Sequence, residues 1–250
     1  MRRRVVPAAI ALVVLGGLVG WAVTGLHDFG HPPEPYASAA VRLALHDRHV
    51  TNTVAGVTFD VRGIDTLGEE LILFSAAIGA TLLLRAQRAE RREREAAEER
   101  EETRRLISSS LRALGAVLVG PTLVLGVYVV AHGQLTPGGG FQGGVILAAA
   151  LLLVYAAGQL LALERVRPID LVEVAESVGA AAFVLVAIGG LVFGAAVMEN
   201  FLPLGTQGSL LSGGTIPVLN VAVGLEVAGA VTLILTEFLD QALLHSGARD

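Results

Sequence analysis

Long apolar stretches separated by shorter polar segments dominate this chain. Six of the stretches are long enough to cross a hydrocarbon core of about 30 Å, which takes about 20 mostly apolar residues in a helix. Each should be helical, because a segment inside lipid must satisfy its own backbone hydrogen bonds. We therefore predict an all-α, polytopic membrane protein with transmembrane helices at about 5–26, 64–84, 111–131, 143–163, 174–197 and 217–239.

The composition supports this class. Hydrophobic residues make up 53% of the chain, charged residues only 16%, and the mean hydropathy is +0.66. Such a balance is too apolar for a soluble domain of this length. Cysteine is absent, which excludes disulfides, thiolate metal sites and cysteine nucleophiles.

The positive charges predict the orientation. Lysine is absent, so arginine carries all of them. If the N-terminus is cytoplasmic, all of the 18 basic residues except Arg42, Arg48 and Arg62 fall in cytoplasmic segments. The positive-inside rule therefore predicts that both termini are cytoplasmic.

The first apolar stretch has a second interpretation. Arginines precede it and a small-residue pattern follows at 37–39, as in a secretory signal. The apolar run is longer than an ordinary signal core, and the small residues lie well past its end. We expect the first helix to be retained.

A charged segment divides the chain. Residues 85–105 contain eight Arg and seven Glu and almost no hydrophobic side chains. Glu and Arg at i,i+4 spacing, such as Glu90 with Arg94, would support a solvated helix. We interpret the segment as a cytoplasmic linker between a two-helix module at 1–84 and a four-helix module at 106–250.

The long polar segment predicted outside the membrane, residues 27–63, carries four histidines. They are His27, His31, His46 and His49. Their spacing is weak for a metal site and no carboxylate pattern supports one. We expect a solvated loop and no metal.

A glycine-rich sequence, TPGGGFQGGVI at 136–146, opens the fourth apolar stretch. Proline and glycine disfavour helix, and glycine adopts positive φ freely, so a tight break is expected here. The glycines also have the small-xxx-small spacing that lets transmembrane helices touch. We expect a turn with close packing that presents Phe141 and Gln142 to a partner at the outer surface. The residues of the motif are Pro137, Gly138, Gly139, Gly140, Phe141, Gln142, Gly143 and Gly144.

This motif resembles the signature of the B-type subunit (MnhB) of the Mrp-type, also called Mnh or Sha, multisubunit sodium/proton antiporters. The similarity covers about 106–244 and includes GGTIP at 213–217. The resemblance implies a domain of four transmembrane helices. Related modules occur in membrane-bound hydrogenases of the complex I superfamily.

A second resemblance covers the first module. FDVRGIDTLGE at 59–69 is similar to the DFRGFDTLGE pattern in the C-terminal part of the A-type antiporter subunit, which is homologous to a small two-helix hydrogenase subunit. Two neighbouring pieces of one complex are then fused here. The proton-channel part of the A-type subunit is missing, and its lysine relay cannot be carried over to a chain without lysine.

Acids inside the predicted helices are candidates for an ion or proton pathway. A charge deep in a helix costs about 2.5 to 3.5 kcal/mol on insertion scales, so each is a functional hypothesis. Glu226 lies nearest the middle of its helix, and Glu69 and Glu70 lie within about five residues of the middle of theirs. Glu69 also belongs to the second motif, so Glu69 and Glu226 are the leading candidates.

Further acids extend this set toward the cytoplasm. Glu176 has Glu173 one turn away, and Glu237 lies about three turns from Glu226 on the same face. Such a graded stripe could hand on protons or bind sodium. The alternative is that these acids pair with arginines or hydroxyls of neighbouring subunits and secure assembly.

A polar motif precedes the second helix. Asp60, Arg62, Asp65 and Thr66 are expected to form a cap at the helix start. Thr66 and Glu69 have the spacing of a capping box, which gives Glu69 a competing role.

The resemblances imply a non-enzymatic, multi-pass subunit of a sodium/proton antiporter in the cell membrane. Its partners would be subunits of types A, C, D, E, F and G, the transported ions and the lipid bilayer. We expect no cofactor and no nucleic acid. Two alternatives remain open: an ion-translocating module of a membrane-bound hydrogenase or related respiratory complex, and a purely structural scaffold.

Overall fold

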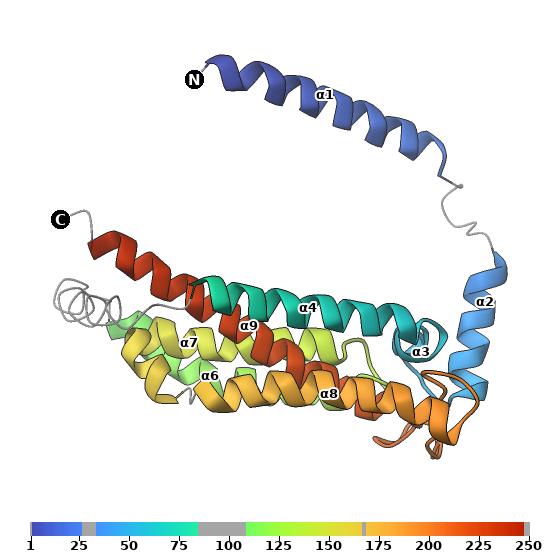
Figure 1. The fold of residues 1–250 in the computed structure, drawn as a ribbon. Coiled ribbons are helices and arrows are strands. Elements are labelled where there is room, and N and C mark those ends of the chain that lie inside the picture. The colour runs from blue at the N-terminus through green and yellow to red at the C-terminus, as the bar shows by residue number, and fades with distance from the viewer. Residues whose placement is uncertain (1, 27–33, 85–108, 167–168, 248–250) are drawn as a thin grey trace. The chain divides into compact units, whose positions relative to one another are not determined.

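The computed structural model describes residues 2–26, 34–84, 109–166 and 169–247 (Figure 1). Every regular element in these ranges is a helix, which confirms the predicted all-α class. The chain divides into two compact units, Met1–Ala39 and Ala40–Asp250. Helix α1 (Arg2–Thr24) lies in the first unit, and α2 (Glu34–Arg42) crosses the boundary between the two.

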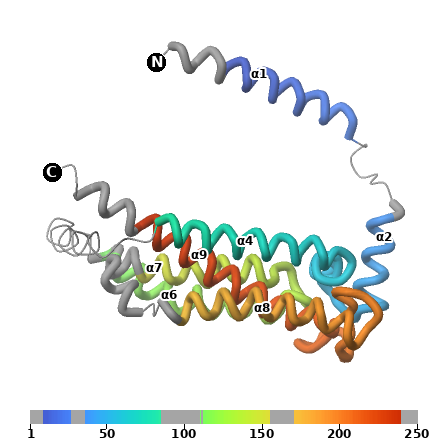
Figure 2. Tube along the Cα trace, in the orientation of Figure 1, coloured from blue at the N-terminus to red at the C-terminus, as the bar shows by residue number. Residues whose placement is uncertain are grey.

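The second unit is built around one central helix. Helix α9 (Ile216–Gly247) packs against α4 (Gly63–Leu84), α7 (Gly140–Val166) and α8 (Ile169–Phe193) (Figures 1 and 2). Helix α6 (Ser109–Ala131) packs mainly on α7. In the membrane-length part of α9, 61% of residues are buried, against 11% in those of α4 and α6. Polar residues of α9 are therefore interior residues.

All six predicted stretches coincide with helices whose ends differ by only a few residues, apart from the longer C-terminal end of α9. Within the described ranges, four helices are long and apolar enough to cross a membrane: Gly63–Leu84, Arg112–Ala131, Leu171–Phe193 and Ile216–Leu239. Two shorter apolar helices are Ala9–Thr24 and Gly140–Val154. The fold is that of a multi-pass membrane protein. Six spans and cytoplasmic termini remain predictions.

The expectation of a solvated loop before α4 was wrong over residues 40–61. After α2 the chain forms two short π-helices, η1 (Leu43–Asp47) and η2 (Val57–Val61), with α3 (Thr53–Gly56) between them. Ala44, Val50 and Phe59 are buried there. Burial of these apolar side chains stabilises the segment against the bundle, so it forms part of the core.

The histidines of this segment are only partly described. His46 and His49 lie in the described residues, whereas His27 and His31 lie outside them. Within the described ranges no group of three or more His, Asp or Glu side chains could hold a metal ion. The His49 Nδ1 lies 2.8 Å from the Gly205 carbonyl oxygen.

Helix α4 of the first predicted module packs into one bundle with the second module. Helix α4, from the first module, contacts both α8 and α9 of the second. The linker at 85–105 lies outside the described residues. The domain boundaries at 84 and 106 therefore stay a prediction, but the interface between α4 and α9 places residues of both modules side by side.

Candidate functional site

Three glutamates from three helices are buried in the bundle. Glu226 on α9 is 0% exposed, Glu70 on α4 is 1% exposed and Glu176 on α8 is 3% exposed. Each lies in a membrane-length segment. Burying a carboxylate is strongly unfavourable unless it is paired, hydrogen-bonded or protonated. The surroundings of these groups therefore decide what they do.

The three carboxyl groups form one cluster, which we call the carboxylate cluster. Glu70 and Glu226 face each other closely enough for their side chains to share a hydrogen bond. That bond needs a proton on one of the two, since an ionised carboxylate only accepts. Glu176 interacts electrostatically with Glu226. The charge states of all three are thus linked.

Donor groups of the described residues do not compensate these charges. Both carboxylate oxygens of Glu70 and of Glu226, and one of Glu176, receive no hydrogen bond from a donor group in the described part of the chain. A buried acidic site of this composition is suited to holding a proton, while its three carboxyl groups are not arranged around a metal ion in this conformation.

Two glycines set the position of two of these glutamates. A Cβ atom on Gly179 would lie 2.8 Å from the Cβ of Glu226, and a Cβ atom on Gly229 would lie 2.7 Å from the Cβ of Glu176. Each glutamate therefore packs against a glycine of the other helix. The absence of side chains at these glycines lets α8 and α9 approach closely at the cluster.

This arrangement follows from a short pattern that occurs twice. The sequence ESVG at 176–179 lies on α8 and EVAG at 226–229 on α9, so both helices carry Glu-x-x-Gly. Two antiparallel helices with this spacing pair reciprocally, each glutamate against the opposite glycine. This repeat is the sequence signal that could have placed Glu176 beside Glu226, and the predictions from sequence did not use it.

The cluster is closed by apolar side chains toward the N-terminal end of α9. Phe59 and Phe183 lie with their ring centroids 6.3 Å apart, and both are buried. They belong to one hydrophobic core with Leu219 and Val223 of α9. Close-packed apolar side chains leave little room for water or an ion on this side.

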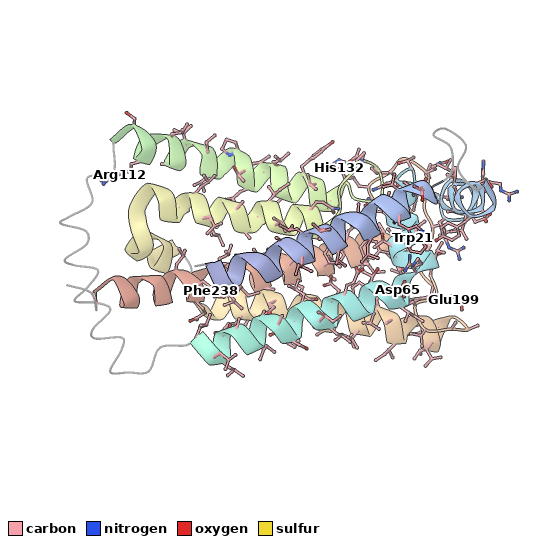
Figure 3. All side chains as sticks on the ribbon, turned by 90° about the horizontal axis from the view of Figure 1, so that it is seen from above. Trp21, Asp65, Arg112, His132, Glu199 and Phe238 are labelled. Carbon is pink, nitrogen blue, oxygen red and sulfur yellow. The ribbon has the colours of Figure 1, made fainter. Side chains whose placement is uncertain are left out.

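Polar groups lie on the other side of the cluster, toward the C-terminal end of α9. Thr232 and Thr236 of α9 are buried, with hydroxyls that donate to the carbonyl oxygens of Ala228 and Thr232. Glu173, one turn before Glu176 on α8, is half-buried and interacts electrostatically with it. Figure 3 labels Asp65 near the start of α4 and Phe238 toward the C-terminal end of α9, well apart along the bundle.

The remaining predicted pathway acids lie elsewhere. Glu69 is exposed on α4, while its neighbour Glu70 is buried. Glu237 is half-buried near the C-terminal part of α9. The structure thus brings Glu226 together with Glu70 and Glu176, and not with Glu69.

The polar motif before α4 does not form the expected cap. Asp60 pairs with Arg48, with Nε and Oδ2 2.8 Å apart, while Arg62 and Asp65 form an exposed pair. Thr66 lies within the first turns of α4, and its hydroxyl donates to the Thr58 carbonyl oxygen at 2.7 Å. The capping box with Glu69 is therefore absent, because α4 starts at Gly63 and not after Thr66.

The glycine-rich motif is a break only in its first half. Gly138 and Gly139 have φ of +133° and +136°, which favour glycine, but α7 begins at Gly140. The prediction of a break as far as Gly144 was wrong. Gly143 lies against Val130 of α6, and Gly144 lies against Val227 of α9. These helical glycines permit close contacts between helices, as their spacing predicted.

Asn220 of α9 stabilises the glycine-rich motif through a hydrogen bond. It is fully buried, and its Oδ1 accepts the Gly140 backbone N–H at 2.9 Å. A Cβ on Gly139 would lie 2.7 Å from this oxygen, so the glycine makes room for the amide. Phe141 packs against the hydrophobic core, which corrects its expected role at the surface, whereas Gln142 is exposed.

We expect Asn220→Ala to destabilise the bundle. The substitution leaves the Gly140 N–H buried without an acceptor, which costs about 1 to 3 kcal/mol. The check is the thermal unfolding midpoint of the purified protein in detergent, with the exposed Gln142→Ala as control. An unchanged midpoint for Asn220→Ala would show that this hydrogen bond does not fasten the motif.

The membrane-length helices and the buried carboxylates define a multi-pass membrane protein with an acidic interior. Residues 110–233 match the MnhB family, described as a domain related to the MnhB subunit of Na+/H+ antiporter. This part of the chain is therefore similar to the MnhB domain. The resemblance of TPGGGFQGGVI to that subunit is thereby confirmed.

Three proteins resemble the chain over most of its length. An uncharacterized protein of Methanocaldococcus jannaschii is 27% identical over 201 residues, which cover 73% of this chain and 75% of that protein. A chain in the membrane-bound sulfane sulfur reductase, an archaeal respiratory membrane complex, is 26% identical with a TM-score of 0.72. The match covers 96% of this chain and 99% of that one.

The third similar protein is a chain in the Mrp complex from Dietzia sp. DQ12-45-1b. It is 22% identical with a TM-score of 0.70, and the match covers 95% of this chain but only 26% of that one. At this identity the likeness shows a shared fold. Both similar chains come from membrane complexes.

Proposed function

We propose that this chain is a membrane subunit of a multisubunit cation/proton antiporter-type complex, in which Glu70, Glu176 and Glu226 exchange protons for cations. The observation that carries the proposal is the carboxylate cluster itself, buried and without a cationic partner among the described residues. The MnhB-like region supports it, since α7 and α8 of that region pack against α9 and both Glu176 and Glu226 lie within it.

Proton and cation would compete for the same oxygens. With a proton present, one carboxyl group of the Glu70–Glu226 pair donates to the other. Without it, two adjacent negative charges remain in a medium of low dielectric, which is unfavourable until the carboxyl groups rearrange around a cation. Proton release and cation binding are therefore coupled by electrostatics. Glu176 adds a third carboxylate to which the proton or cation can move.

In this conformation the surrounding residues favour access of protons to the carboxylate cluster from one side. The apolar core around Phe59 and Phe183 closes the cluster toward the start of α9, whereas Glu173 and the threonines of α9 line the other direction. The distribution of arginines assigns that second side to the cytoplasm. Protons would thus enter and leave the cluster from the cytoplasm while the apolar core stays closed.

The finer assignments rest on the family. We propose sodium as the cation, the cell membrane as the location, and subunits of types A, C, D, E, F and G as partners, because the matched domain is related to an Na+/H+ antiporter subunit. The similarity of FDVRGIDTLGE to the A-type subunit makes the first module a fused piece of that neighbour.

A second candidate function is the same module in a membrane-bound respiratory complex. The match to the archaeal respiratory complex runs end to end, with 96% and 99% coverage, whereas the Mrp chain is matched over only 26% of its length. A chain of this size and arrangement thus has a whole-length counterpart in a respiratory complex. A scaffold without transport is the third possibility.

Purification of the intact complex through a tag on this chain separates the first two candidates. We expect large antiporter-like membrane proteins among the components and no iron–sulfur or nickel proteins, as identified by mass spectrometry. Stoichiometric iron–sulfur proteins would assign the chain to a respiratory complex. The carboxylate cluster would then serve ion movement driven by a redox reaction.

A further inference from the structure

One face of α4 lies opposite the carboxylate cluster and carries a charge within a membrane-length helix. Glu69 is exposed there and forms no hydrogen bond or ion pair with a described residue. It lies about 7 Å from the middle of α4 at a rise of about 1.5 Å per residue, well inside the hydrocarbon core. A carboxylate facing lipid at this depth is unfavourable without a compensating partner.

Three small residues, Gly68, Ser75 and Gly79, lie on the same face together with the larger Ile72. Gly68, Ile72, Ser75 and Gly79 follow one another at spacings of three and four residues, and Ile72 and Ser75 are exposed. A Cβ atom on Gly68 or on Gly79 would meet no other atom within 4 Å. These glycines are therefore not used for packing inside the described chain, in contrast to Gly144 or Gly179. Open small residues at such spacing let a second helix approach closely.

We propose that this face of α4, defined by Gly68, Glu69, Ile72, Ser75 and Gly79, binds a transmembrane helix of another subunit that presents a basic side chain to Glu69. Charge complementarity selects the occupant, since a basic side chain compensates the carboxylate where lipid cannot. The glycine and serine positions bring the two backbones close enough for the pair to form.

The docked helix would also influence the buried site. Glu69 interacts electrostatically with Glu70, and like charges on adjacent residues repel. A cation held against Glu69 offsets this repulsion. The surface itself does not depend on transport, because the exposed carboxylate and the open glycines define it.

Subunit retention tests the surface. We expect Glu69→Gln and Gly79→Leu to reduce the recovery of one other subunit roughly tenfold when the complex is purified through a tag on this chain, which corresponds to a loss of about 1.4 kcal/mol. Glu69→Asp keeps the charge and should retain more of that subunit. Because a Cβ at Gly79 has open space, the substitution leaves the fold of this chain intact. The matched control is Asp65→Asn, an exposed acid at the start of the same helix, which should leave recovery unchanged.

A photoreactive amino acid at Ser75 identifies the occupant in the assembled complex. The expected product joins this chain to a membrane-spanning peptide of another subunit that contains Arg, Lys or His. Products with lipid alone or with a second copy of this chain would overturn the proposal, as would full recovery of all subunits with both Glu69→Gln and Gly79→Leu.

Discussion

Glu226→Gln is expected to abolish cation-driven proton movement in membrane vesicles while leaving the complex assembled. Glutamine has nearly the size of glutamate and its amide can still hydrogen-bond Glu70, but it cannot bind or release a proton. A pH-sensitive dye in everted vesicles measures the effect when the cation is added. The signal should fall to that of vesicles without the complex.

The control for this substitution is Glu199→Gln. Glu199 is exposed and accepts the backbone N–H of Ala196 at 3.0 Å, far along the chain from the cluster. Glu199→Gln removes one carboxylate outside the cluster, so transport should persist. Full transport by the assembled Glu226→Gln complex would instead exclude Glu226 from the pathway and favour the scaffold.

Gly179→Leu is expected to abolish transport although all three glutamates remain. A Cβ at Gly179 would already lie 2.5 Å from the Ala222 carbonyl oxygen and from the Glu226 backbone nitrogen. The larger side chain must push α8 from α9, which costs about 1 to 3 kcal/mol or more and displaces Glu226 from Glu70. Transport and the thermal unfolding midpoint are the two readouts.

Substitutions by alanine test the same prediction even if Gly179→Leu prevents folding. Gly179→Ala and Gly229→Ala add a single methyl at the two reciprocal contacts and should each lower transport, with Gly120→Ala as control. A Cβ on Gly120 would meet nothing within 4 Å, so that variant should be unaffected. Normal transport in both Gly179→Ala and Gly229→Ala would show that close approach at these glycines does not position the carboxylates.

The helices were predictable from the sequence for a simple reason. Apolar length alone specifies a membrane-length helix, and all six stretches became helices close to the expected residues. The segment before α4 was not predictable in the same way. Its apolar residues, such as Val50 and Phe59, are few and scattered, and only the packed structure shows that they are buried.

The site was predictable only in part, because depth along a helix can be read from sequence but direction cannot. Glu69 and Glu70 have nearly the same depth, yet side chains of adjacent helical residues point about 100° apart. Which of the two is buried depends on where α8 and α9 pack. Membership of a family motif favoured Glu69, whereas the tertiary contacts select Glu70 for the buried cluster.

Infrared difference spectroscopy of the purified complex tests the central claim most directly, since it observes protonated carboxyl groups themselves. The comparison is between the wild-type complex and one in which Glu70, Glu176 and Glu226 are all glutamine, each taken from acidic to alkaline pH. We predict a protonated-carboxyl band that disappears on alkalinisation in the wild type and is missing from the variant. An identical band in both complexes would contradict the proposal that this cluster holds the exchangeable proton.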